Sequence, residues 1–224
     1  TNTFFPQPPP SNIKTTPLKE QLAGNDVNSK LKYILDIFGH TDYRSKNQKE
    51  AIISLLNGND TVAIIPTGGG KSLVGQGPAM AAQGKVSLFV CPLLSLMKDQ
   101  VDNHLKRGFP AKMIMSKMTK GEINKIYNDF KNTTTLLLYV TPERCKNNKF
   151  REAIQWLIDR DRMGYVIVDE AHCITAWGKS FTAAALANSG SAGANFSCRN
   201  RHRPNLKVIS VTSGRLACLA RNCW

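Results

Sequence analysis

The sequence has few acidic residues and no long hydrophobic run. It contains 16 Asp and Glu against 30 Lys and Arg, which gives a formal net charge of +14. Such an excess of positive charge favours a polyanionic partner. No apolar run approaches the roughly 20 residues of a membrane-spanning helix, and the first residues show no hydrophobic region of a signal peptide. We therefore expect no membrane attachment.

Cysteine is scarce and irregularly spaced. The six cysteines include no C-x-x-C pair. Cys198 and His202 lie four residues apart, but no second pair completes a set of zinc ligands. We therefore expect free or buried thiols in a reducing compartment, with no disulfide framework and no zinc site within this chain.

A glycine-rich stretch follows a strongly apolar segment, Thr61–Ile65, which predicts a buried strand. After Pro66 the chain reads Thr67, Gly68, Gly69, Gly70, Lys71 and Ser72. A strand, a glycine turn and a helix in this order are typical of a phosphate-binding loop, whose backbone N–H groups point at phosphate oxygens. We expect Lys71 to contact the β- and γ-phosphates and Ser72 to ligate Mg²⁺. A plain glycine turn is the less favoured interpretation.

Strands and helices alternate along most of the chain. Predicted strands cover residues 61–65, 85–91, 111–115, 135–140, 165–169 and 206–211, and predicted helices cover 71–82, 94–106, 120–130 and 150–161. Two earlier helices are expected, one capped by Asn28-Ser29 and ended by Gly39, the other at 45–56. This order predicts an α/β fold, a parallel sheet with helices on both faces. Ligands of such sheets bind beyond the carboxyl ends of the strands.

A second apolar strand ends in two adjacent acids, Asp169 and Glu170. The parallel topology places them at the same sheet edge as the glycine loop. Asp169 can hold Mg²⁺ and Glu170 can orient and deprotonate an attacking water. Adjacent acids also occur as solvated strand ends, but together with the glycine loop they predict an ATPase.

Several ordered blocks resemble the RecQ-type DNA helicases of superfamily 2. They lie between about Leu31 and Phe181 and comprise residues 38–44 with Gln48, 66–72, 92–101, 139–144 and 169–174, followed by Trp177-Gly178. The resemblance implies the P-loop NTPase fold of a RecA-like lobe. It also implies an ATP-dependent helicase that unwinds DNA from 3′ to 5′ with ATP and Mg²⁺. Nuclear residence is expected from the resemblance and the basic charge, and a role in DNA repair and recombination from the resemblance.

The resemblance assigns roles around the nucleotide. The amide of Gln48 can bond to both N6 and N7 of adenine, and Arg44 helps to hold the nucleotide. His40 stands where relatives usually carry an aromatic residue that stacks on the base. His172 links the nucleotide site to the next motif and joins Lys71, Asp169 and Glu170 in the expected catalytic set.

The resemblance also indicates a nucleic-acid face. The candidates for contact are Ser95, Lys98, Thr141, Arg144, Trp177 and Phe181. Hydroxyls and cations suit phosphate oxygens, whereas the two aromatic side chains can stack on unpaired bases. Alternatively, Lys98 and Arg144 belong to a solvated surface and Trp177 covers the sheet. Leu93, Leu94 and Met97 are expected in the core.

The resemblance fails after Phe181, which sets the expected domain bounds. Residues 1–27 are expected to be a disordered leader and 28–181 the ATP-binding lobe. Residues 182–203 are an atypical low-complexity segment, which a frame change, an alternative exon or a mis-drawn gene model would explain. Residues 204–224 contain the remnant of a strand and a tail.

The relatives' second lobe, with its arginine finger, is missing from this sequence, and such a finger raises turnover by ~10³–10⁵. We therefore expect weak binding and poor hydrolysis from the chain alone. A truncated ATP- and DNA-binding fragment and an RNA helicase lobe are the alternatives. Tyr43-Arg44 with Gln48, and Trp177-Gly178, favour the RecQ type. The oligomeric state stays open.

Overall fold

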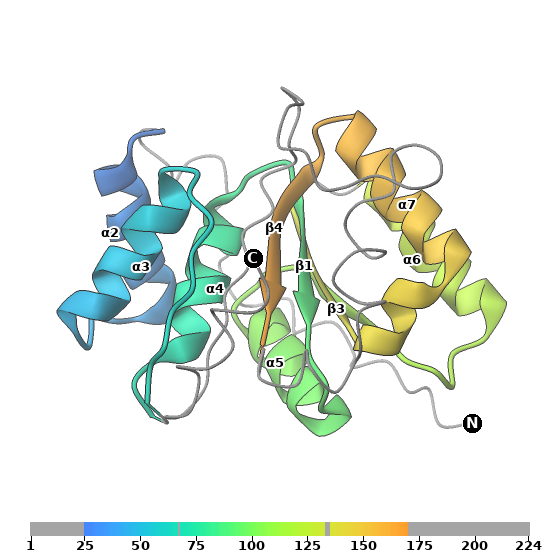
Figure 1. Ribbon diagram of the computed structural model, residues 1–224, viewed down its shortest axis with the longest axis horizontal. Coiled ribbons are helices and arrows are strands. Elements are labelled where there is room, and N and C mark those ends of the chain that lie inside the picture. Colours follow the sequence, from blue (N-terminus) through green and yellow to red (C-terminus); the bar gives the residue numbers. More distant parts are fainter. Residues whose placement is uncertain (1–24, 67, 133–134, 170–224) are drawn as a thin grey trace, which may run out of the picture.

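The computed structural model describes residues 25–66, 68–132 and 135–169 (Figure 1). The elements in order are α2 (Val27–Phe38), α3 (Lys46–Leu56), α4 (Lys71–Ala81), β1 (Val86–Val90), α5 (Leu94–Lys106), β2 (Ala111–Ile114), α6 (Lys120–Asn132), β3 (Leu136–Val140), the 3₁₀ helix η1 (Pro142–Lys146), α7 (Asn148–Asp159) and β4 (Met163–Val168). The expected leader up to residue 24, the segment 182–203 and the tail 204–224 lie outside the described residues.

The four strands form one sheet in the order β2-β3-β1-β4. Every pairing is parallel, with Val86 opposite Leu136 and Val90 opposite both Val140 and Val168. Helices connect the strands, as parallel pairing requires. The predicted α/β fold with a parallel sheet is therefore confirmed.

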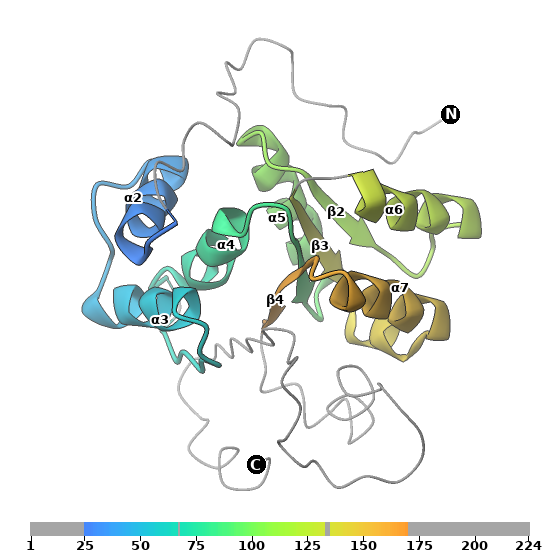
Figure 2. The same cartoon turned by 90° about the horizontal axis from the view of Figure 1, so that it is seen from above.

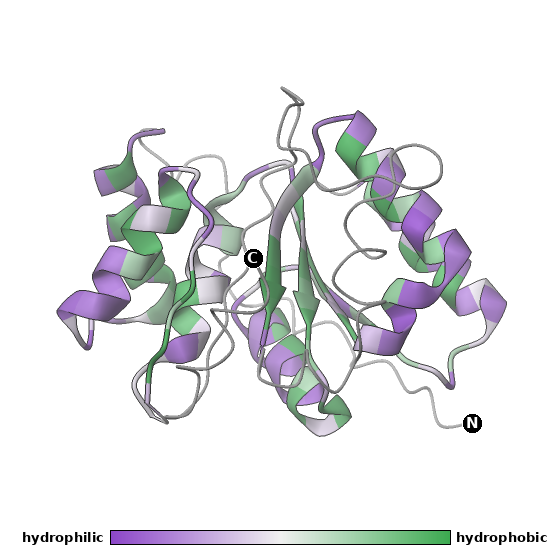
Figure 3. Cartoon of the chain, viewed as in Figure 1, coloured by the Kyte–Doolittle hydropathy of each residue, from purple (hydrophilic) through white to green (hydrophobic). Residues whose placement is uncertain are grey.

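Alternate side chains of each strand enter two separate cores. Phe89, Tyr139 and Ile167 pack with helices α2 to α5, whereas Leu88 and Leu138 pack with α6 and α7. Figure 2 shows α4 and α5 on one side of the sheet and α6 and α7 on the other. Figure 3 shows apolar strands between helices that turn hydrophilic residues outward. Helices thus cover both faces, as predicted.

Capping residues define the ends of the first two helices, α2 and α3, which precede the glycine loop. Asp26, not the predicted Asn28-Ser29, caps α2, because its carboxylate accepts from the backbone N–H groups of Asn28 (2.9 Å) and Ser29 (3.0 Å). Gly39, with φ 65°, ends this helix as predicted. Ser45 caps α3 by accepting from the N–H of Gln48 at 3.2 Å.

The prediction of a buried strand at 61–65 is wrong. The segment forms no ladder with any strand in the described part of the chain. Thr61, Ala63 and Ile65 are buried, whereas Val62 and Ile64 are 57% and 55% exposed. The alternation of an extended segment is present, so one face packs into the core. A strand also needs a partner backbone, and apolar periodicity cannot supply one.

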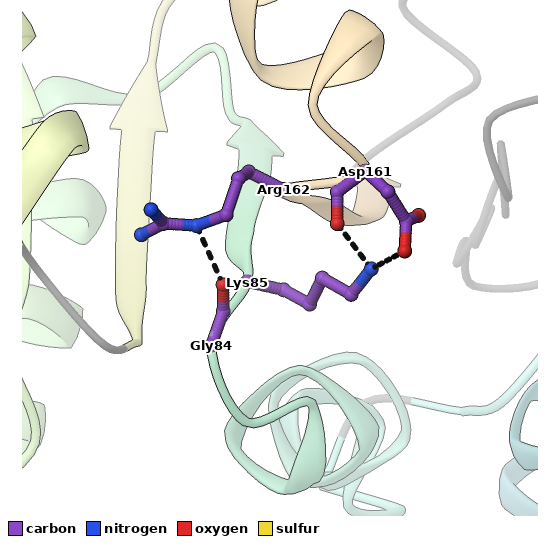
Figure 4. A network of polar contacts seen from close by, with 4 residues as sticks. All are labelled: Gly84, Lys85, Asp161 and Arg162. Atoms are coloured by element: carbon purple, nitrogen blue, oxygen red, sulfur yellow. Dashed lines mark hydrogen bonds and ion pairs between the residues drawn. The ribbon is translucent and has the colours of Figure 1, made fainter.

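Polar contacts fasten the amino ends of β1 and β4, opposite the edge that bears the glycine loop. Lys85 forms an ion pair with Asp161 (Nζ to Oδ2, 2.7 Å) and also donates to its backbone carbonyl. Arg162 donates from Nε to the carbonyl of Gly84 at 2.8 Å (Figure 4). These contacts join the amino ends of the two strands, while the parallel ladder between β1 and β4 places their carboxyl ends side by side.

Candidate functional site

Two glycines of the loop have backbone angles that other residues rarely adopt. Gly68 has φ 80° and Gly70 has φ 84°. A Cβ at Gly69 would lie 2.5 Å from Cγ2 of Ile65. Gly70 occupies the N-cap position of α4, and no described side chain caps that helix. The first turn of α4 therefore directs backbone N–H groups and its positive dipole end toward the loop, which suits an anion.

The expected phosphate and metal ligands lie around this helix end. Lys71 is half-buried and Ser72 is exposed in the first turn of α4. Asp169 follows β4 directly, and its N–H donates to the carbonyl of Val90 at 2.9 Å, which holds it at the carboxyl edge of the sheet. Helix α4 packs against β4. A hydroxyl and a carboxylate are hard oxygen ligands, so the residues present fit Mg²⁺.

Gln48 and Arg44 bond directly to the glycine loop. The Gln48 side chain is buried, and its Nε2 donates to the carbonyl of Gly70 at 2.8 Å. Its Oε1 accepts from the backbone N–H of Arg44 at 2.9 Å. The Arg44 guanidinium in turn donates to the carbonyl of Gly68. The start of α3 and the loop are therefore one hydrogen-bonded unit, across 22 residues of sequence.

These bonds bear on the role predicted for Gln48. In this conformation both Oε1 and Nε2 of the Gln48 amide are hydrogen-bonded to the backbone of the protein. Adenine recognition by Gln48 stays a prediction, and it requires the amide to share or exchange these bonds when a base arrives. The same amide bonds to Gly70 of the glycine loop. Binding of adenine and binding of phosphate would therefore both alter the hydrogen bonds of Gln48.

His40 and Tyr43 border this unit. His40 is exposed and stacks on Phe38, with ring centroids 6.2 Å apart and planes inclined by 24°. Its ring is therefore positioned at the surface, where a base could reach it. Tyr43 donates from its hydroxyl to the carbonyl of Leu31 at 2.8 Å, and burial raises the pKa of this hydroxyl to about 12. Tyr43 thus anchors the segment before α3 onto α2.

The four described candidates for nucleic-acid contact differ in exposure. Ser95 and Lys98 are exposed in the first turns of α5, whereas Thr141 is buried at the end of β3. Arg144 is half-buried and donates from Nη2 to the carbonyl of Met115 at 3.3 Å. Arg144 therefore braces η1 against the loop after β2, and only part of its guanidinium is open to a phosphate.

The core prediction is right for Met97 and wrong for its neighbours. Met97 is fully buried, but Leu93 and Leu94 are 56% and 48% exposed. The buried stripe of α5 runs through Met97, Val101 and His104, and the helix start lies outside it. Two exposed leucines thus stand beside Ser95 and Lys98, a surface feature that apolar character alone could not reveal.

Several predicted site residues cannot be placed. Thr67, Glu170, His172, Trp177 and Phe181 lie outside the described residues, so their roles stay predictions. Among the described residues no three His, Cys, Asp or Glu side chains gather as a metal site. Cys198 and His202 lie outside that part. No described helix combines the length and apolar character needed to cross a membrane.

Comparison with known proteins identifies the family. The signature described as "DEAD/DEAH box helicase" matches residues 45–212. The chain belongs to the DEAD/DEAH box helicase family. Within this family it is 41% identical over 145 residues to the ATP-dependent DNA helicase RecQ of Pasteurella multocida, covering 65% of this chain and 22% of the relative. The resemblance to RecQ-type helicases is thereby confirmed.

Eukaryotic relatives give the same result. Identity is 35% over 148 residues to rat ATP-dependent DNA helicase Q5, covering 65% of this chain and 15% of the relative. It is 37% over 139 residues to the yeast ATP-dependent helicase SGS1, covering 60% of this chain and 10% of the relative. This helicase chain therefore spans less than a quarter of the length of these curated relatives.

A solved helicase structure has the same fold. The crystal structure of the DUF1998 helicase MrfA matches with a TM-score of 0.57 and 15% identity, covering 82% of this chain and 28% of that one. At this identity the match supports the helicase fold alone. It agrees with the parallel sheet and flanking helices described above.

Proposed function

We propose that this chain is the first, ATP- and DNA-binding lobe of an ATP-dependent DNA helicase of the RecQ type, unwinding from 3′ to 5′. The observation that carries the proposal is the hydrogen-bonded unit of Arg44, Gln48 and the glycine loop. It joins two nucleotide-binding segments of the RecQ type in one place. The identity to DNA helicases over this lobe supports the same conclusion.

In the proposed ATPase reaction the glycine loop and Lys71 bind the β- and γ-phosphates. The backbone N–H groups at the start of α4 orient the phosphate oxygens, and Lys71 adds a positive charge. Ser72 and Asp169 would hold Mg²⁺, which neutralises charge on the phosphates when bound. Glu170 orients and deprotonates the attacking water, and His172 connects this site to the segment that follows.

DNA is the proposed polymer. Ser95, Lys98, Thr141 and Arg144 would contact phosphate oxygens, while Trp177 and Phe181 would stack on unpaired bases at ~1–3 kcal/mol per base. The formal net charge of +14 supports a salt-sensitive, sequence-independent contact. Location in the nucleus and a role in DNA repair and recombination are proposed on the resemblance alone, since relatives occur in bacteria as well as in yeast and mammals.

A second candidate is an ATP- and DNA-binding fragment without helicase activity. The chain spans 22% of the length of the bacterial RecQ that it matches. An ATP site of this class is completed by a second lobe, and unwinding needs two lobes that move against each other. Either candidate, tested as this chain alone, would bind without unwinding, so strand displacement after addition of a second lobe distinguishes them.

Substitution of Lys71 tests the nucleotide site. Lys71→Ala should reduce the affinity for a fluorescent ATP analogue at least about tenfold, because it removes the cation that faces the phosphates. Titration by fluorescence anisotropy measures this affinity. Lys32→Ala, which changes an exposed lysine of α2, is the matched control and should bind as the wild type does. Equal affinity of the Lys71→Ala protein would contradict the proposed site.

A further inference from the structure

Four polar side chains form a hydrogen-bonded chain between α4, β3 and α5, three of them buried and the fourth, Gln100, half-buried. We call Gln76, Gln100, His104 and Tyr139 the buried polar chain. Gln76 is 5%, Tyr139 3% and His104 0% exposed. Nε2 of Gln76 lies 2.5 Å from Oε1 of Gln100 and 3.3 Å from the hydroxyl of Tyr139, which lies 2.8 Å from Nε2 of His104.

The hydrogen bonds of the buried polar chain diverge from the Gln76 amide. The two N–H groups of the Gln76 amide serve Gln100 and Tyr139. The Tyr139 hydroxyl accepts from Gln76 and also bonds to Nε2 of His104, where the tautomer of His104 sets which atom donates. The other ring nitrogen, Nδ1, is buried and has no hydrogen-bond partner among the described residues. Burial, with a smaller contribution from Arg107, lowers the pKa of His104 to about 4, so its ring is neutral near pH 7 and can accept. Tyr139 is held further by stacking on Phe89, with centroids 4.6 Å apart.

The positions of these residues connect the two predicted binding surfaces. Gln76 follows Lys71 by five residues on α4, the helix whose first turn faces the phosphates. Gln100 follows Lys98 by two residues on α5, and Tyr139 precedes Thr141 by two residues at the end of β3. One network therefore extends from α4 to α5, which carries Ser95 and Lys98, and to β3, which Thr141 follows directly.

Polar side chains in this part of the core carry a risk for stability that apolar side chains would not. A buried donor or acceptor left without its partner costs ~1–3 kcal/mol, whereas apolar side chains of similar shape would pack without that risk. The bonds are also directional, so a shift of α4 along its axis must move Tyr139 or break a bond. Apolar contacts would let the helix slide. The buried polar chain thus suits transmission of displacement better than simple stabilisation.

We propose that Gln76, Tyr139 and His104 are positioning residues that couple the nucleotide site to the DNA-contacting motifs. The inference rests on the proposed function, because it needs both ligands to bind. Nucleotide at the start of α4 displaces that helix. Gln76 then carries the displacement to Tyr139 and Gln100, and so to Thr141 on one side and Lys98 on the other. Each ligand thereby changes the affinity for the other by the same factor.

The experiment measures this factor in the full chain of 224 residues. Fluorescence anisotropy gives the affinity for a labelled single-stranded oligonucleotide with and without saturating non-hydrolysable ATP analogue. Wild type should show a change of about fivefold or more, at the low end of typical couplings. Tyr139→Phe removes one hydroxyl and keeps the ring on Phe89. It should bring the factor to within about twofold of one, while each ligand alone binds as it does to wild type.

Tyr33→Phe is the matched control, because this buried tyrosine of α2 has a hydroxyl without a hydrogen-bond partner among the described residues. It should keep the wild-type coupling. Gln76→Met breaks the buried polar chain from its other end and should reproduce the loss if Tyr139→Phe fails to fold. Unchanged coupling in either folded variant, or no coupling in a wild type that binds both ligands, overturns the inference alone. A wild type that binds neither ligand overturns the proposed function as well.

Discussion

Single residues of the glycine loop determine how closely α3 can approach it. Gly70 has φ 84°, which other residues rarely adopt. It also has no space for a side chain, since a Cβ there would lie 2.2 Å from Nε2 of Gln48. Gly58 has a similar φ of 91° but nothing within 4 Å of such a Cβ. Substitution of Gly58 by alanine would therefore cause backbone strain alone, whereas substitution of Gly70 would cause backbone strain and a collision with Gln48.

Gly70→Ala should weaken binding of an ATP analogue at least about tenfold, because the added methyl group displaces Gln48 and the loop carbonyl it binds. Gly58→Ala is the control for backbone strain. Both variants should lose roughly 1–2 kcal/mol of stability from the left-handed conformation, measured by urea denaturation. Only Gly70→Ala should lose affinity, measured by anisotropy. Equal affinities of the two variants would contradict a role for the Gln48–Gly70 contact in nucleotide binding.

His104 should make stability depend on pH. Its pKa is lowered from 6.5 to about 4 in the folded chain. Between these values the unfolded chain binds more protons, so stability falls as the pH drops below 6.5 and levels off below about 4. From pH 7 to pH 5 the wild type should lose about 2 kcal/mol more than His104→Gln. Urea denaturation at both pH values measures this, and equal losses would contradict a buried neutral histidine.

Helix ends, rather than helix interiors, connect the elements to the site. The N-terminus of α4 adjoins the glycine loop, the start of α5 bears Ser95 and Lys98, and the start of α3 places Gln48 against that loop. Each of these ends lies on the side of the sheet where β1 and β4 finish. Because helix ends carry unsatisfied backbone groups, their caps control both stability and placement.

Ser45→Ala should lower stability by about 1 kcal/mol, since the Ser45 hydroxyl accepts from the N–H of Gln48 and caps α3. The ATP-analogue affinity should also fall, because fraying of this turn releases Gln48 from Gly70. Lys46→Ala is the control in the next position. Its ion pair with Glu50 is exposed, so neither stability nor affinity should change measurably. Loss of stability without loss of affinity would show that the cap does not position Gln48.

At the scale of the whole molecule, the described residues combine a sheet covered by helices on both faces with the glycine loop that leads into α4. Two cores on opposite faces of the sheet bury apolar side chains from every described strand. Such a lobe has the apolar interior needed to fold on its own. In a two-lobed motor a second lobe closes on the bound ATP, so binding and turnover are separable properties.

The chain of 224 residues should therefore bind single-stranded DNA without unwinding duplex. Its DNA affinity should fall steeply with salt because phosphate contacts release counterions. DNA-stimulated ATPase and strand-displacement assays should show no appreciable activity. Comparison of DNA with RNA as competitor distinguishes the DNA-binding lobe from an RNA helicase lobe. Robust unwinding by this chain would contradict the need for a second lobe.

Several properties were determined by the sequence itself. The alternation of apolar strands and helices predicted the parallel sheet, and the helix ends at Gly39, Ser45 and Lys71 were readable because caps and glycine turns are local. The glycine turn before α4 was also readable, since Gly68 and Gly70 adopt the positive φ angles that consecutive glycines permit. These features need no distant partner, and a contiguous stretch of residues therefore reveals them.

Only the tertiary structure decided which distant groups meet. Extended residues 61–65 found no ladder partner among the described strands, and Leu93 remained exposed because α5 turns another stripe inward. The bond from Gln48 to Gly70 and the one from Gln76 to Tyr139 span 22 and 63 residues. No periodicity encodes such pairs, because hydrogen bonds between distant side chains depend on how the packed helices and strands bring them together.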